Sequence, residues 1–167
     1  MSTKIVDKEV RQATHIPILV RVFDLSQGDV LELGTGYFST GLLRWLCQMY
    51  ERKLYSYETS DFWYQKLSKK PAAFHEAFKI PKWGEAEIER PWGMAFIDHA
   101  PDERRWVEIK RLANWAEYIV IHDSNLSDVK EYGYERIWNL FKYRFDFTKL
   151  NPNTTVVSNF HDLSNLK

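Results

Sequence analysis

A glycine turn is the feature of this sequence of 167 residues best suited to holding a ligand. The segment Gly34-Thr35-Gly36 follows a short apolar run, and Ser39 stands where the next helix is expected to begin. Glycines in such a turn let the backbone approach a ligand closely, and the first turn of a helix offers unpaired N–H groups. The pattern therefore predicts a nucleotide-like ligand here, with a tight turn that binds nothing as the alternative.

Two acidic residues accompany the glycine turn. Glu58 lies 22 residues after Gly36 at the end of a second expected strand, where the acid of dinucleotide-binding folds accepts hydrogen bonds from ribose. Glu32 precedes the turn, and its carboxylate suits a ligand with an ammonium group better than a pyrophosphate. Ser39 stands where the dinucleotide fingerprint has its third glycine. Together these residues favour S-adenosylmethionine over a nicotinamide dinucleotide.

Two Asp and His pairs end two later apolar runs, as Asp98-His99 and His122-Asp123. If these runs are neighbouring strands, Asp98 and Asp123 lie about 5 Å apart, which is the distance between adjacent strands. Two carboxylates at this distance repel each other. A shared divalent cation, a raised pKa on one acid, or a nearby cation would reconcile them. Either acid could instead cap the loop or helix that follows it. The candidates for the nearby cation are His99, Arg104 and Arg105.

Histidine is the residue type best suited to serve as a general base here. An unperturbed imidazole titrates near the pH at which a hydroxyl nucleophile must lose its proton. His122 and His99 are the main candidates, with a hydrogen-bonded structural role as the alternative for each. The N-terminal segment could also bring His15 to the same place.

The elements that must position these residues alternate between strand and helix, which predicts an α/β fold. Right-handed crossovers then give a doubly wound, mostly parallel seven-stranded sheet with a C-terminal antiparallel hairpin, and ligands bind beyond the carboxyl ends of its strands. The expected strands are 30–33, 53–57, 72–78, 93–97, 118–121, 144–150 and 154–158. The expected helices are 8–23 with a break near Pro17, 39–50, 60–69, 102–115 and 128–141, with an irregular or short helical connection from Pro81.

Composition limits the class of protein. Hydrophobic residues make up 44% and charged residues 28%, which predicts one globular domain over 1–167 with an N-terminal helical segment, 1–27. Because 23 Lys and Arg balance 23 Asp and Glu, a nucleic-acid partner is not expected. The single Cys47 excludes an internal disulfide and suits a cytoplasmic location. The apolar stretches are shorter than the roughly 20 residues that cross a bilayer, so no membrane partner is expected.

A family resemblance follows from these residues. Val30-Leu-Glu-Leu-Gly-Thr-Gly-Tyr-Phe-Ser-Thr40 resembles motif I of the Rossmann-like, class I S-adenosylmethionine-dependent methyltransferases, and the resemblance runs from about residue 28 to 158. It implies that the glycine turn surrounds the methionine moiety and that Glu58 holds the ribose. Phe38 stands where the commonest form has another glycine. The predicted cofactor-binding residues are Glu32, Gly34, Thr35, Gly36, Tyr37, Ser39, Glu58 and Asp98.

The segments 96–105 and 119–125 resemble the fourth- and fifth-strand segments of catechol O-methyltransferase-like enzymes. In that subgroup the fourth-strand acid and an Asp-Asn pair bind Mg²⁺, and a lysine serves as base. Asp98 and Asp123 occupy the acidic positions, but Ser124 stands in place of the paired Asn. The lysine is likewise replaced, by a proline. A Mg²⁺-dependent mechanism is therefore not favoured, and no metal ligand is predicted.

The resemblance implies transfer of a methyl group from S-adenosylmethionine to an oxygen or nitrogen of a small-molecule acceptor. One alternative is a catalytically silent cofactor-binding subunit of a partner complex, and another is a nicotinamide-dependent dehydrogenase. Four aromatic residues either cover adenine or an aromatic acceptor, or pack in the core: Tyr37, Trp63, Tyr64 and Trp83. The predicted catalytic residues are His122, Asp123 and His99.

Overall fold

The structure is a computed structural model, and it describes residues 8–67 and 72–166. Its strands are β1 Val30–Leu33, β2 Leu54–Glu58, β3 His75–Lys79, β4 Trp92–Ile97, β5 Ala116–His122, β6 Tyr143–Phe147 and β7 Thr154–Ser158. Its α-helices are α1 Lys8–Arg11, α2 Ile16–Leu25, α3 Thr40–Met49, α4 Asp61–Leu67, α5 Arg105–Leu112 and α6 Leu126–Glu131. Its 3-10 turns are η1 Trp83–Glu85, η2 Asp102–Arg104, η3 Tyr134–Arg136, η4 Trp138–Leu140 and η5 Ser164–Leu166.

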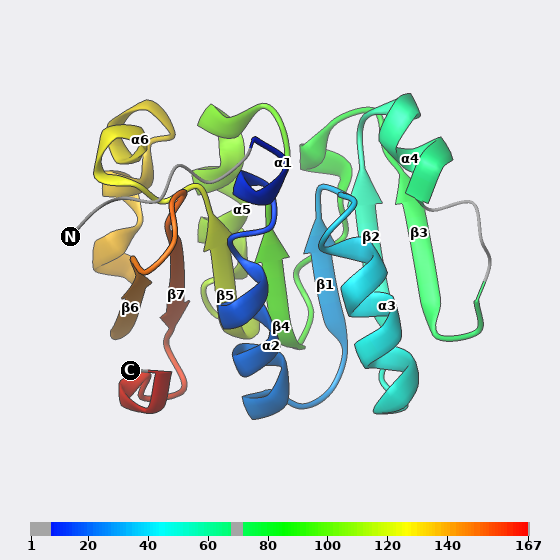
Figure 1. Cartoon of the computed structure of the whole chain (residues 1–167), viewed down its shortest axis with the longest axis horizontal. Coiled ribbons are helices and arrows are strands. Elements are labelled where there is room, and N and C mark those ends of the chain that lie inside the picture. The colour runs from blue at the N-terminus through cyan, green and yellow to red at the C-terminus, as the bar shows by residue number, and fades with distance from the viewer. Residues whose placement is uncertain (1–7, 68–71, 167) are drawn as a thin grey trace.

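All seven strands form one sheet in the order β3-β2-β1-β4-β5-β7-β6 (Figure 1). The first five pair in parallel, and β7 runs antiparallel to both β5 and β6. Chain order reverses between β1 and β4, because the chain first moves outward to β3 and then returns to start β4 beside β1. This is the doubly wound sheet with a closing hairpin that the sequence predicts.

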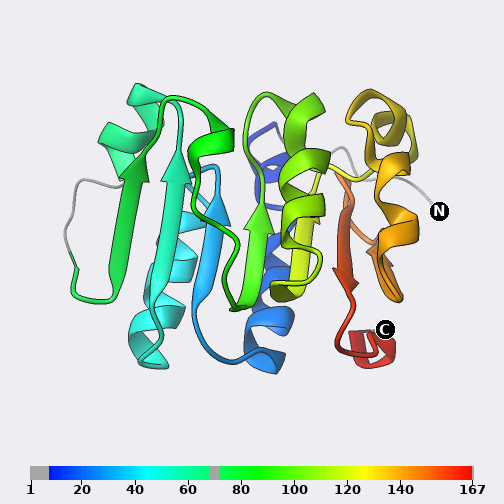
Figure 2. The same cartoon turned by 180° about the vertical axis from the view of Figure 1, so that it is seen from behind.

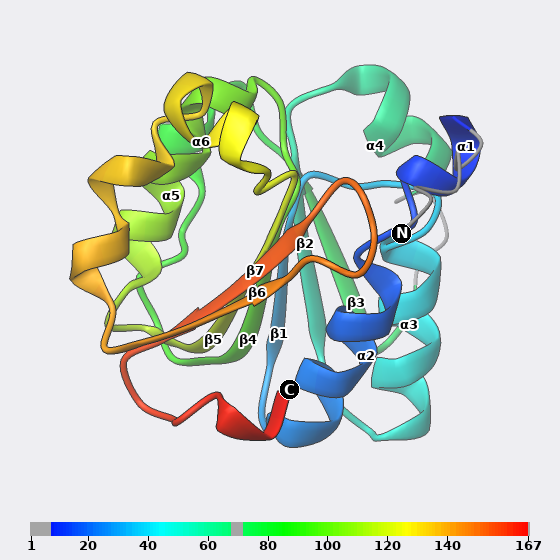
Figure 3. The ribbon, with the colours of Figure 1, turned by 60° about the vertical axis from the view of Figure 1, so that its left-hand side comes forward.

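The sheet lies between two layers of helices (Figure 2, Figure 3). Helices α2 and α3 cover one face, and α5 and α6 lie on the other. Because side chains alternate across a strand, β1 sends Val30 to the α2 and α3 face and Leu31 to the opposite face, and both are fully buried. The continuous apolar runs of β1, β4 and β5 are therefore strands covered on both sides.

One expected helix differs from the structure, and the break expected in another is present. The segment 128–141 breaks into α6, η3 and η4, because Gly133 adopts a φ of 70° that ends a right-handed helix. The segment 8–23 is broken before Pro17, as predicted, into α1 and α2, and Pro17 lies in the first turn of α2, where its missing N–H leaves no hydrogen bond unmade.

Several expected element ends also shift by a few residues. Strand β3 begins at His75 rather than at residue 72, and β6 ends at Phe147 rather than at residue 150. Helix α5 ends at Leu112 and is preceded by the 3-10 turn η2. The expected end of a helix at residue 69 lies outside the described residues. No helix in the described parts of the chain is long and apolar enough to cross a membrane.

Candidate active site

A cavity of about 410 Å³ lies at the carboxyl ends of β1, β4 and β5. The reversal of strand order between β1 and β4 separates the loops that follow them, which is where doubly wound sheets bind ligands. The glycine turn after β1 forms one wall, and the residues after β4 and β5 form the other. The lining residues are Arg11, Gln12, His15, Thr35, Gly36, Tyr37, Phe38, Ser39, Trp63, Asp98, His122, Asp123 and Pro152.

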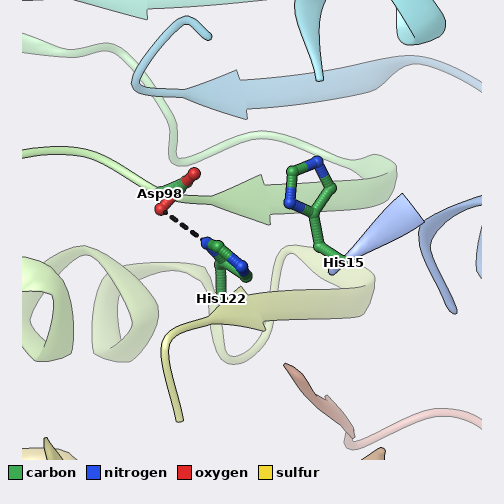
Figure 4. A group of neighbouring side chains, drawn as sticks. All are labelled: His15, Asp98 and His122. Carbon is green, nitrogen blue, oxygen red and sulfur yellow. Dashed lines mark hydrogen bonds and ion pairs between the residues drawn. The ribbon is translucent and has the colours of Figure 1, made fainter. Parts of the chain in front are cut away.

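Asp98 and His122 meet at the floor of this cavity because of strand register. Ile97 of β4 pairs with Ile121 of β5, so the next residue of each strand points to the same face. The Nδ1 atom of His122 lies 3.2 Å from Oδ1 of Asp98 (Figure 4). Burial works to raise the pKa of Asp98, but the charges of His122 and Arg105 hold it at about 2. Asp98 is therefore a carboxylate at neutral pH.

Both ring nitrogens of His122 have polar partners. Its Nε2 lies 3.1 Å from the Thr14 hydroxyl, and that hydroxyl has carbonyl acceptors at Pro152, 2.9 Å away, and at Arg11. Because a carboxylate only accepts hydrogen bonds, Nδ1–H of His122 donates to Asp98. Burial works to lower the pKa of His122, but Asp98 and Asp123 raise it above its ordinary value. His122 therefore lines the cavity with both ring nitrogens engaged, one by Asp98 and one by Thr14.

His15 precedes α2 and faces the same cavity. Its ring packs against Phe96 and stands edge-on to His122, with centroids 4.7 Å apart in each pair. The residue is 1% exposed, and neither ring nitrogen has a hydrogen-bond partner among the described residues. Burial and the charge of His122 lower the pKa of His15 to about 3. His15 is therefore a neutral imidazole with a free lone pair.

Arg105 of α5 resolves the repulsion expected between Asp98 and Asp123. Its guanidinium lies 3.1 Å from Asp98, 2.9 Å from Asp102 and 3.3 Å from Asp123. It also donates to two backbone carbonyls at the strand ends, those of His99 and His122. A buried cation of the protein thus bridges the two acids.

Asp123 keeps one side open to the cavity, with 25% of its side chain exposed. Its φ of 53° is in the left-handed region, which Asp tolerates better than most residues. Burial raises the pKa of Asp123, and Asp98 acts in the same direction, while His122 and Arg105 oppose them. Among the predicted catalytic residues, Asp123 is the one whose pKa is moved toward that of a useful base.

His99 does not reach the cavity, which corrects the expectation that it takes part in catalysis. As the neighbour of Asp98 it points to the opposite face of the sheet, where its side chain is fully buried. It stacks on Trp83 with ring centroids 4.1 Å apart and lies 3.4 Å from a carboxylate oxygen of Glu108. Burial lowers the pKa of His99 although Glu108 opposes the shift. His99 thus packs between Trp83 and Glu108 of α5, outside the cavity.

The glycine turn crosses the end of β4. Gly34 has a φ of 88°, and a Cβ atom built on it would lie 2.5 Å from the Cα of His99. Glu58 holds the turn from the β2 side, because its Oε2 accepts hydrogen bonds from both the backbone N–H and the hydroxyl of Thr35. Its Oε1 accepts from the N–H groups of Thr59 and Ser60. All four acceptor sites of Glu58 are thus used within the chain, so a ribose would have to displace one of these donors.

Glu32 holds the turn from below instead of facing the cavity. It shares the α2 and α3 face with Val30 and is 0% exposed. Its two oxygens accept hydrogen bonds from Thr40, at 2.9 Å, and from Ser56, at 2.7 Å, and Thr40 in turn accepts from the Gly36 N–H. The expected contact between Glu32 and a ligand ammonium group is therefore not open in this structure.

We expect Glu32 to make stability fall as pH rises. Burial raises its pKa from 4.5 to about 7, although hydrogen bonds from Ser56 and its neighbours oppose the shift. Between these values the folded protein keeps a proton that the unfolded chain loses, so the free energy of unfolding declines by about 3 kcal/mol. Glu32→Gln removes this decline. Urea unfolding at pH 4.5 and at pH 7.5 should show the variant gaining about 3 kcal/mol relative to the wild type.

The matched control is Glu76→Gln on β3, which removes one exposed carboxyl group without touching the buried network. A Glu32→Gln variant whose stability followed the wild type across this pH range would contradict the protonated state of Glu32.

The aromatic residues divide between the cavity and the rest of the chain. Tyr37 and Trp63 line the cavity edge-on to each other, with centroids 5.0 Å apart. Trp83 is buried against His99, and Tyr64 lines a second pocket beside β2 and β3, so neither covers the strand-end cavity. Sequence reasoning missed three lining residues that only the tertiary fold brings over the strand ends: Arg11 at the end of α1, and Gln12 and Pro152 in loops.

Comparisons with known proteins identify the fold. No protein-family model and no curated protein sequence matches the chain. Among solved structures, the SAM-dependent O-methyltransferase from Thermotoga maritima is 13% identical, with a TM-score of 0.61 over 96% of this chain and 68% of that chain. N-methyltransferase NodS from Bradyrhizobium japonicum WM9 is 10% identical, with a TM-score of 0.63 over 93% and 99%. The N-terminal domain of human METTL16 in complex with SAH is 12% identical, with a TM-score of 0.58 over 88% and 70%. The chain thus has the class I methyltransferase fold.

Proposed function

We propose that this chain is an S-adenosylmethionine-dependent methyltransferase acting on an oxygen or nitrogen of a small molecule. The observation that carries the proposal is the cavity between the glycine turn after β1 and the ends of β4 and β5. Its volume of about 410 Å³ is within the range of small-molecule sites. The structurally similar proteins include an O-methyltransferase, an N-methyltransferase and one complex with SAH, which agrees with this chemistry.

The residues of the cavity suit a cationic cofactor. Asp98 and Asp123 present carboxylates to the space that a sulfonium and an ammonium group would occupy. Thr35 to Ser39 supply a close backbone wall, and Tyr37 with Trp63 offers an aromatic edge for adenine. When bound, S-adenosylmethionine supplies an electrophilic methyl group. The chain's task is then to align the acceptor and to exclude water.

Asp123 is the residue we propose to take the proton from the acceptor. It is partly exposed in the cavity, and its pKa is raised by burial, which brings a carboxylate closer to the proton affinity that a general base needs. His122 and Arg105 on either side hold it in place through their charges. A small-molecule acceptor in a cytoplasmic setting remains our prediction for the physiological reaction.

The binding test is calorimetric titration with S-adenosylmethionine and its product S-adenosylhomocysteine. We expect binding to the wild type and a loss of about 2- to 10-fold in affinity for Trp63→Ala, because an aromatic contact is worth about 0.5–1.5 kcal/mol. Trp45→Ala is the matched control: Trp45 lies on α3, is 69% exposed and does not line the cavity. Absence of binding by the wild type would refute the proposal, and binding of NADH instead would support the dehydrogenase alternative.

The silent-subunit alternative needs a separate test of turnover. We expect Asp123→Asn to bind the cofactor as the wild type does and to lose methyl transfer in a screen of small hydroxyl and amine acceptors. Cofactor binding by a wild type that transfers no methyl group, but does so with an added partner protein, would favour the silent subunit.

A further inference from the structure

We propose that His15, Asp98 and His122 bind a divalent transition-metal ion, with Zn²⁺ as the reference ion, at the floor of the cavity. The proposal concerns the ion alone and does not rest on methyl transfer. One ligand atom from each residue lies within 4.8 Å of the others, in the arrangement shown in Figure 4. Two imidazoles and one carboxylate leave at least one coordination position for a ligand that enters the cavity.

The distance between two of the three ligand atoms already matches that in a zinc site. Two ligands of a tetrahedral zinc ion, with bonds of about 2.1 Å, lie about 3.4 Å apart. His122 Nδ1 and Asp98 Oδ1 are 3.2 Å apart, so these two atoms already lie at the separation that a zinc ion requires. The third ligand has to approach by about 1 Å or more, which a change in the His15 side-chain torsions can provide.

His15 supplies an independent reason to expect a ligand. Buried polar groups are almost always hydrogen-bonded, yet this imidazole has no partner on either nitrogen among the described residues. It lines the cavity together with Asp98 and His122, so its lone pair has access to the same space. A metal ion bound beside Asp98 and His122 would give one of these nitrogens a partner.

The surroundings of His122 match those of a metal-binding histidine. Such histidines usually donate their second ring N–H to a fixed acceptor, which sets the tautomer and the ring orientation. Nε2 of His122 is hydrogen-bonded to the Thr14 hydroxyl at 3.1 Å, and this hydroxyl is itself held by the carbonyl of Pro152. This leaves Nδ1, the atom facing Asp98, as the metal ligand once an ion replaces its proton.

The charges around the site favour a divalent cation. Asp98, Asp102 and Asp123 surround the single guanidinium of Arg105, which leaves two negative charges when the imidazoles are neutral. A divalent ion on the imidazole side of Asp98 would balance them. Arg11 also lines the cavity, but it is exposed to solvent, which screens its charge.

The donor set decides which ions bind. Imidazole nitrogen suits zinc, cobalt, iron and nickel, whereas Mg²⁺ prefers oxygen ligands and keeps its water. The oxygen-rich side between Asp98 and Asp123 is filled by Arg105. The proposed site therefore shares Asp98 with the catechol-type one, but it has two imidazoles in place of the other oxygen ligands and takes a different ion.

The test is titration of the full chain with Zn²⁺ and, for a spectroscopic signal, with Co²⁺, with no cofactor added. We expect one ion per chain, visible cobalt absorption bands of a low-coordinate nitrogen and oxygen site, and no comparable binding of Mg²⁺. His15→Phe should weaken Zn²⁺ binding by at least 100-fold while keeping the fold, because Phe fills the same space beside Phe96 and removes only unpartnered nitrogens. His161→Phe is the matched control, far from the cavity beside Tyr118.

A second variant separates binding from folding. Thr14→Val removes the hydroxyl that orients His122 and should weaken Zn²⁺ binding by about 10- to 100-fold. Equal affinity of wild type and His15→Phe for Zn²⁺, or equal affinity of the wild type for Mg²⁺ and Zn²⁺, would overturn the proposal. The cofactor titration fails or succeeds independently, since neither assay contains the other's ligand.

Discussion

Arg105→Gln should destabilise the chain by about 3–5 kcal/mol at pH 7, a loss large enough to unfold many small domains. Arg105 is 3% exposed, and its guanidinium is the cation shared by Asp98, Asp102 and Asp123. A glutamine at this position makes some of the hydrogen bonds but supplies no charge. Asp98 and Asp123 would then face each other across the cavity floor with only His122 between them.

The pH dependence of this loss has a defined sign. In the wild type the pKa of Asp98 is about 2 instead of 3.8, so its favourable interaction is present above pH 3.8 and disappears as pH falls toward 2. In Arg105→Gln much of that interaction is missing at every pH. The difference in free energy of unfolding between wild type and variant should therefore be largest near pH 7 and should shrink toward pH 3, as urea denaturation would measure.

Arg144→Gln provides the comparison for this prediction. Arg144 pairs with Asp146 on β6 at 2.9 Å, and both side chains are about one-third exposed or more. Exposed pairs of this kind contribute about 1 kcal/mol or less. If Arg105→Gln were no more destabilising than Arg144→Gln, Arg105 would not be the residue that holds the strand ends together.

The sheet could be predicted from the sequence because its strands are short, apolar and separated by clear turns. Val30–Leu33 and Trp92–Ile97 are buried throughout, and such runs occur where both faces of a parallel sheet are covered. The helix over 128–141 was wrong because Gly133 adopts a φ of 70° beside Trp106, where an added Cβ atom would lie 2.9 Å from the Trp106 side chain. That contact is tertiary and leaves no trace in local spacing.

The sequence predicts that the strand-end residues lie at the same edge of the sheet, but it does not predict which face of the sheet each side chain points to. Register decides which of them meet: Ile97 pairs with Ile121, so Asp98 joins His122, and His99 turns toward α5. Strand alternation also sends Glu32 into the layer beneath α3. Sequence position alone indicates that these residues lie within or after a strand. The face to which each side chain points depends on how that strand pairs with its neighbour.

Two further features depend on long-range contacts. Thr14 and His15 join the site only because the chain before α2 folds across β4 and β5. The four hydrogen bonds that occupy Glu58 come from residues on two different loops. Glu58 ends β2 as predicted, but the donors that reach its carboxylate in the structure are groups of the chain itself.

Gly34→Ala should be strongly destabilising, by more than about 3 kcal/mol, because two unfavourable effects coincide. A left-handed backbone costs an L-residue with a Cβ about 1–2 kcal/mol. The new Cβ would also lie 2.5 Å from the Cα of His99 and 2.6 Å from its N, and these backbone atoms cannot rotate away as a side chain could. The clash can be relieved only by moving the glycine turn off the end of β4.

That movement would reach the cavity as well as the fold. Thr35 and Gly36 follow Gly34 and form the cavity wall, so a displaced turn would break the Thr35 bonds to Glu58 and abolish cofactor binding in the calorimetric titration. Gly41→Ala is the matched control. Gly41 lies in α3 with no atom within 4 Å of its built Cβ, so alanine there should be neutral or stabilising by about 1 kcal/mol. Equal unfolding free energies for the two alanine variants would show that the turn does not need glycine at position 34. The close approach of Gly34 to the backbone of His99 at the end of β4 would then be wrong.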